Sequence, residues 1–105
     1  MSRDSSRLIM ELDKHRREVN RATINPSLSA VDADMLLPVV KTCARARADF
    51  IEYFVEICDG DNEDNCTPEQ IKQLKQFRMA YEELVSAANA LETVIKRGYV
   101  DVKIS

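Results

Sequence analysis

The side chains best suited to chemistry in this sequence are one histidine and three cysteines. His15 would need partners for catalysis or metal binding, and the carboxylates at helical spacing from it are Glu11 and Glu18. We therefore interpret His15 as a residue at the edge of the core. Cys43 has no base placed to activate its thiol, so we interpret it as a small core side chain.

The acidic loop between Cys58 and Cys66, with Asp59, Asp61 and Asp64, is a candidate metal site. Zinc sites pair thiols about two to four residues apart, which is closer than these two thiols. The loop also lacks the order of a calcium-binding EF-hand, which needs a glycine sixth and a glutamate twelfth. The sequence therefore predicts a solvated loop, no metal and no cofactor. A Cys58–Cys66 disulfide in an oxidising setting stays open.

A basic set on the first two helices could bind phosphate if these helices are neighbours. Its members are Lys14, Arg16, Arg17, Arg21, Lys41 and Arg45. Against this use, the chain has no glycine-rich phosphate loop, no helix-turn-helix spacing and no interleaved aromatic residues. A net charge of −3 also makes the whole surface a poor attractor of nucleic acid. The set is therefore predicted to be a solvated face, with nucleic-acid binding as the alternative.

Composition indicates which elements must position these residues. Among 105 residues there are only 2 glycines and 3 prolines, too few turn formers for a many-stranded β fold. A hydrophobic content of 45% with 31% charged residues is typical of a helical bundle rather than of a disordered chain. One all-α domain is expected.

The strongest helix signal runs from Thr67 to Gly98. Thr67 is a capping residue, Pro68 fits the first helical position, and Gln70 completes a capping box. Gly98 can take the left-handed conformation that ends a helix. Between these ends, apolar residues repeat at alternating spacings of three and four: Leu74, Phe77, Tyr81, Leu84, Ala88, Leu91 and Ile95.

Two further helices are predicted, from Asp4 to about Ala22 and from before Pro38 to about Cys58. The first has an apolar seam of Leu8, Leu12, His15, Val19 and Ala22. The second has the seam Leu36, Val39, Cys43, Ala46, Phe50, Tyr53 and Ile57, with extra apolar flanks at Val40, Ala44, Ile51, Phe54 and Val55. Because this arc exceeds half the circumference, the second helix either lies between the other two or keeps a face for another chain.

The predicted fold is an all-α, antiparallel bundle of three main helices over residues 1–98, with a strand-like tail over residues 99–105. Two points stay open: a short extra helix before Pro38, and whether Asp32 or Asp34 caps the second helix. Val100, Val102 and Ile104 alternate in the tail as in a strand, but the sequence offers no clear partner strand. The tail is expected either to fray or to pair with another chain.

No Ser/His/Asp set, paired carboxylates or nucleotide fingerprint appears, so the chain is not expected to be an enzyme. We predict a non-enzymatic interaction module, such as an adaptor, accessory subunit or chaperone-like protein, that self-associates as a dimer or docks on a larger protein. The predicted contact residues are Arg47, Ile51, Phe54, Val55, Val100, Val102 and Ile104. Arg47 lies near the middle of the apolar arc, where it either contacts a partner or covers apolar surface with its stem.

The sequence predicts a cytoplasmic protein. No apolar run is long enough to cross a bilayer, and the first residues lack the apolar core of a signal peptide. An odd number of cysteines agrees with reduced thiols.

Overall fold

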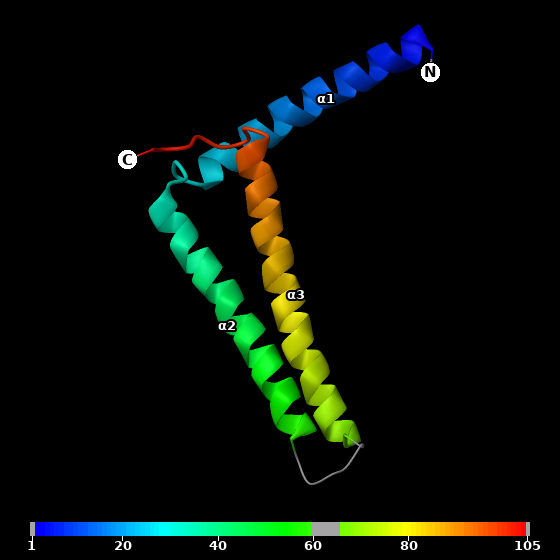
Figure 1. Cartoon of the computed structure of the whole chain (residues 1–105). Coiled ribbons are helices and arrows are strands. Elements are labelled where there is room, and N and C mark those ends of the chain that lie inside the picture. The colour runs from blue at the N-terminus through cyan, green and yellow to red at the C-terminus, as the bar shows by residue number, and fades with distance from the viewer. Residues whose placement is uncertain (1, 60–65, 105) are drawn as a thin grey trace. The chain divides into compact units, whose positions relative to one another are not determined.

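The computed structural model describes residues 2–59 and 66–104, so the acidic-loop residues 60–65 lie outside the described part of the chain. The predicted all-α class with three main helices is confirmed, and Figure 1 shows the helices. In chain order the elements are α1 (Arg3–Ile24), the short 3₁₀ helix η1 (Asn25–Ser27), α2 (Ala33–Cys58) and α3 (Pro68–Lys96).

The chain forms two compact units. The hairpin unit is Leu36–Ala90, and it contains most of α2 and α3. The terminal unit combines Met1–Met35 with Leu91–Ser105, and it therefore contains α1 together with the tail. The tail that the sequence pattern separates at residue 99 thus belongs to the same unit as the first helix.

Local hydrogen bonds define both ends of α3 as predicted. The Thr67 backbone N–H donates to Gln70 Oε1 at 2.9 Å, and the Gln70 N–H donates to Thr67 Oγ1 at 3.1 Å, which completes the capping box. At the other end Gly98 has φ 71°, and the Tyr99 N–H donates to the Val94 carbonyl at 3.0 Å. A glycine accepts this positive φ without the steric cost that a Cβ would add.

The start of α2 resolves the point left open around Pro38. The Asp32 carboxylate accepts a hydrogen bond from the Met35 N–H at 3.0 Å, so Asp32 rather than Asp34 caps the helix. Pro38 lies inside α2, so residues 33–37 belong to α2 and form no separate helix, and the three-residue η1 lies further upstream. Pro38 removes one backbone donor early in the helix, and the helix nevertheless continues to Cys58.

The hairpin unit is held together by aromatic side chains along the α2–α3 seam. The rings of Phe50 and Tyr81 lie 6.1 Å apart between centroids, and those of Tyr53 and Phe77 lie 5.2 Å apart. Because residue numbers rise along α2 while their partners' numbers fall along α3, the two helices are antiparallel. Ile57 is buried near the end of α2. The apolar seams predicted for these two helices therefore do pack against each other.

The core of the terminal unit is small and is built around Val31. Val31, Tyr99 and Val100 are buried. The Val31 N–H donates to the Asp101 carbonyl at 2.9 Å, and the Lys103 N–H donates to the Val31 carbonyl at 2.8 Å. These bonds form an isolated parallel bridge between Val31 and Val102. The strand-like tail thus has a partner within the chain, a single residue that carries no strand pattern of its own.

Candidate interaction surface

The apolar seam of α1 is exposed along most of the helix. Every residue from 2 to 19 is exposed, with Leu8 at 71% and Val19 at 61% of their full accessible surface. Figure 1 shows the first turns of α1 (blue) reaching beyond the tail of its own unit. Within the terminal unit, the seam that the sequence predicts as a core face is therefore not covered by the unit's other described residues.

His15 shares this exposure, which corrects its interpretation as a residue at the edge of the core. Its side chain is mostly accessible, and Nε2 lies 3.9 Å from Glu11 Oε2 one helical turn away. The reason for the difference is that a heptad pattern identifies a face but not whether a neighbour covers that face.

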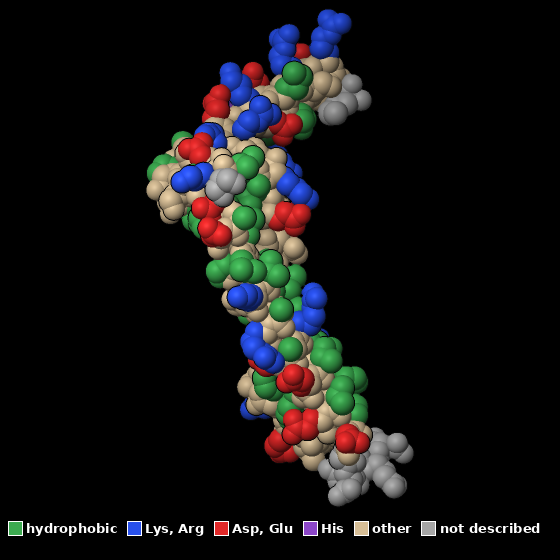
Figure 2. Space-filling view, turned by 60° about the vertical axis from the view of Figure 1, so that its left-hand side comes forward, with side chains coloured by type: hydrophobic (Ala, Val, Ile, Leu, Met, Phe, Trp, Pro, Cys, Tyr) green, Lys and Arg blue, Asp and Glu red, His purple; other side chains and the backbone are tan. Residues whose placement is uncertain are grey.

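A second exposed apolar face lies on α2 within the hairpin unit. Only part of the wide apolar arc of α2 contacts α3. The rest is exposed to solvent and forms an apolar stripe, which we call the α2 stripe: Leu37, Val40, Ala44, Ile51, Phe54 and Val55. The first five recur at spacings of three, four and seven, and Val55 follows Phe54 directly; at about 100° per residue all six lie on one side of the helix. Figure 2 shows hydrophobic side chains gathered on the surface of this part of the chain.

The α2 stripe borders a shallow apolar groove on the same side of the hairpin. The groove has a volume of about 260 Å³, and its wall from α3 is formed by Val85 and Ala88. Its wall from α2 includes Val40 and Ala44 of the stripe. A groove of this kind arises because two helices have a single line of closest contact, and small residues such as alanine leave space beside it.

Arg47 contacts the other helix of its own hairpin. Its Nε donates to the Tyr81 hydroxyl at 3.2 Å, and its guanidinium carbon lies 5.4 Å from the centroid of the Tyr81 ring. The residue is exposed and lines the groove beside the α2 stripe. Arg47 therefore bridges α2 and α3 at the edge of the surface for which the sequence proposed it.

The three predicted contact residues of the tail differ in their exposure to solvent. Val100 is buried in the core of the terminal unit, so its side chain is not on the surface. Val102 and Ile104 remain exposed. Alternation predicts one face for all three, but only Val100 is covered in the structure.

The predicted basic set is divided between the two units. Lys14, Arg16, Arg17 and Arg21 belong to the terminal unit, whereas Lys41 and Arg45 belong to the hairpin unit. Several members are paired with acids. Arg16 lies 3.2 Å from Asp13, Arg21 pairs with Asp101, and Arg45 lies 3.1 Å from Asp49 and 3.6 Å from Glu52.

Two members of the basic set nevertheless line a hollow in each unit. Arg16 and Arg17 line a hollow of about 340 Å³ together with Arg97, Tyr99 and Asp13. Arg97 was missing from the predicted set because its place in the sequence marked it only as the end of a helix. In the hairpin unit, Lys41 and Arg45 line an open hollow of about 520 Å³ that also includes Asp49. An acid accompanies the basic side chains in both places, which weakens either hollow as a phosphate site.

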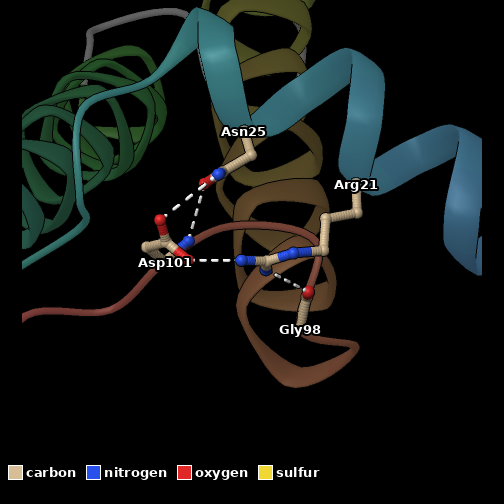
Figure 3. Close-up of polar contacts among 4 residues, drawn as sticks. All are labelled: Arg21, Asn25, Gly98 and Asp101. Carbon is tan, nitrogen blue, oxygen red and sulfur yellow. Dashed lines mark hydrogen bonds and ion pairs between the residues drawn. The ribbon is translucent and has the colours of Figure 1, made fainter.

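A polar clasp joins the end of α1 to the tail (Figure 3). The Arg21 guanidinium donates to the Gly98 carbonyl at 2.9 Å and to the Asp101 carboxylate. Asn25 completes the clasp, because its Oδ1 accepts from the Asp101 N–H at 2.8 Å and its Nδ2 donates to the carboxylate at 3.3 Å. These donors, chiefly the hydrogen bond from Arg21, hold the pKa of Asp101 below its ordinary value.

We expect the clasp to persist in mildly acidic solution and to open only at low pH. Because the folded-state pKa of Asp101 is lowered, its contribution is present above the ordinary aspartate value of about 3.9 and is lost as the pH falls through the lower folded value. A titration of the Asp101 carboxyl carbon by NMR should therefore give a midpoint below that of an ordinary aspartate. The variant Arg21→Gln should move this midpoint upward, and an unchanged midpoint would contradict the assignment of the clasp.

The remaining candidates for chemistry are sparse in residues 2–59 and 66–104. The thiols of Cys43, Cys58 and Cys66 are free, and Cys43 donates to the Leu84 carbonyl at 3.6 Å within the hairpin seam. Within the described residues no group of three or more His, Cys, Asp or Glu side chains converges on a possible metal site. No helix in this part of the chain has both the length and the apolar character that a membrane span requires.

The surfaces best suited to binding are thus apolar and helical: the seam of α1 in the terminal unit and the α2 stripe in the hairpin unit. Comparisons of the chain with protein-family models, with curated proteins and with solved structures find no match.

Proposed function

We propose that this protein is a non-enzymatic interaction module that binds protein through exposed apolar helix faces, either by self-association or by docking on a larger partner. The observation that carries the proposal is the α2 stripe. Ile51, Phe54 and Val55 are all exposed on one side of a helix whose opposite seam is already packed. A contiguous apolar face of this kind on a folded chain is typical of a binding surface.

Nucleic-acid binding is the weaker alternative. It is supported by the hollow that Arg16, Arg17 and Arg97 line, and it is opposed by the carboxylates paired with three members of the predicted basic set. Native mass spectrometry of the protein purified gently from its own host separates the two functions. A dimer or a heavier protein complex supports the interaction module, whereas bound oligonucleotide mass supports the alternative. A bare monomer contradicts both.

If the α2 stripe is the binding surface, replacing Ile51 by aspartate should weaken the complex by roughly tenfold or more, because a charge would then be desolvated in an apolar interface. The matched control is Lys72→Gln, which makes the same change in net charge at an exposed position of α3. Sedimentation velocity measures assembly, and circular dichroism checks that both variants remain helical. Equal assembly by the two variants would contradict the use of this stripe.

A further inference from the structure

We propose that α1 is the self-association element of this protein and that its exposed seam pairs with the same seam of a second copy, as a short parallel coiled coil in register. This inference deepens the proposed function, on which it rests, by naming one partner. The argument uses the exposure of the seam, its heptad spacing and the charges beside it.

The seam has the spacing of a coiled coil. Leu12 and Val19 fall at the first apolar position of successive heptads, called a, while Leu8, His15 and Ala22 fall at the second, called d. All five residues are exposed, so no other described segment of the terminal unit occupies the place of a partner helix. With alternating steps of four and three over about two heptads, a matching helix could cover the seam continuously.

The charges beside the seam are complementary for one orientation only. Position g, before each a residue, holds Glu11 and Glu18, and position e, after His15, holds Arg16. In a parallel pair each g residue faces the e residue five positions further along the partner helix. Glu11 of each copy then faces Arg16 of the other, so two attractive pairs form.

In an antiparallel pair of α1 helices the charges beside the seam would repel rather than attract. There g residues face g residues, so Glu11 of one copy would approach Glu18 of the other twice, and like charges in this position repel. Among the other charges on α1, Asp4 falls at position g one turn before the seam begins, and Asp13 and Lys14 lie outside the seam. The sequence of α1 therefore complements itself in the parallel orientation and opposes itself in the antiparallel one.

The structure leaves these charges accessible for such a pair. Glu11 and Arg16 have about half of their side-chain surface exposed, and their contacts within α1 are to His15 and Asp13 one turn away. Exposed pairs of this kind contribute little, so exchanging them for contacts across an interface costs little. Two heptads with a histidine layer give a weak dimer, and His15 would be the polar layer that limits its strength.

The first test is sedimentation equilibrium of the full chain over a wide range of concentration. We expect the wild-type chain to dimerise and Leu12→Asp to weaken the dimer by roughly tenfold or more, because an apolar layer is replaced by facing charges. Lys14→Gln makes the same change in net charge outside the seam and should leave the dimer unchanged. His15→Leu should tighten the dimer about tenfold by replacing the polar layer.

The second test reverses the charge at Glu11 or at Arg16 and thereby distinguishes a parallel pair of α1 helices from an antiparallel one. Glu11→Lys and Arg16→Glu should each weaken the homodimer about fivefold, because each makes two repulsive pairs. Mixed together, the two variants should form a heterodimer in excess of the statistical half, since both pairs between them are then attractive. Their different masses make the heterodimer visible by native mass spectrometry. Tightening by Glu11→Lys would instead indicate an antiparallel pair and overturn the proposal.

The outcomes also separate this inference from the function on which it rests. If the wild-type chain dimerises but Leu12→Asp has no effect while Ile51→Asp does, the α1 proposal is overturned and the interaction module stands. If the purified chain stays monomeric at several hundred micromolar but is isolated from its host in complex with another protein, the α1 proposal is likewise overturned and the interaction module stands. If it is monomeric in both settings, both proposals are overturned.

Discussion

Replacing Val31 by aspartate is expected to release the tail and disrupt the terminal unit, at a cost on the order of 4 kcal/mol. Val31 is only 2% exposed, beside the buried side chains of Tyr99 and Val100. A carboxylate at this position would lose its water, and burying a charge is among the costliest single changes. The backbone bonds from Val31 to Asp101 and Lys103 would be lost together with the packing.

Val102→Asp is the matched control for this experiment. Val102 is the bridge partner of Val31 but is 53% exposed, so the same new carboxylate would remain in water. Amide hydrogen exchange at Lys103, whose N–H is held by the Val31 carbonyl, measures whether the tail stays in place. Protection should disappear in Val31→Asp and persist in Val102→Asp. Comparable loss in both variants would mean that the bridge, rather than burial of Val31, holds the tail.

Replacing Ile57 by alanine is expected to destabilise the hairpin unit by about 3 kcal/mol. Ile57 is 8% exposed at the end of α2, so the shorter side chain would leave a cavity as well as lose buried apolar surface. Urea denaturation followed by circular dichroism gives the free energy of unfolding. The slope with denaturant should stay close to that of the wild-type chain, because the same surface is exposed on unfolding.

Ile51→Ala is the internal comparison, since it is the same substitution in the same helix. Ile51 is 50% exposed in the α2 stripe, so its truncation should cost less than about 1 kcal/mol in the isolated chain. The two isoleucines thus distinguish stability from binding: Ile57 supports the hairpin, and Ile51 is available to a partner. Equal losses of stability would contradict this division of the apolar arc.

Both ends of α3 were predictable from the sequence because the bonds that define them are local. The capping box joins Thr67 to Gln70 three residues away, and the helix stop at Gly98 uses bonds within the last turn. The pairing of the α2 and α3 seams was also predictable, since heptad spacing on both helices and a short connection favour antiparallel neighbours. The unusual width of the apolar arc of α2 likewise indicated that one helix could not cover it.

Which apolar faces stay uncovered was decided by tertiary structure alone. Heptad spacing is the same for Leu8 on α1 as for Phe77 on α3, yet Leu8 is exposed and Phe77 packs against Tyr53. Periodicity reports that a face is apolar, but only the folded chain determines whether another segment reaches it.

In the terminal unit, contacts between residues distant in sequence could likewise not be predicted from periodicity. A lone Val31 pairs with Val102, and Arg21 reaches Asp101, across most of the length of the chain. These contacts depend on where the turn after α3 directs the tail, so no spacing rule within either segment reveals them. The sequence by itself determined the three helices, both ends of α3 and the apolar faces, because these follow from interactions within a few residues. Tertiary structure decided which faces became core and which stayed exposed.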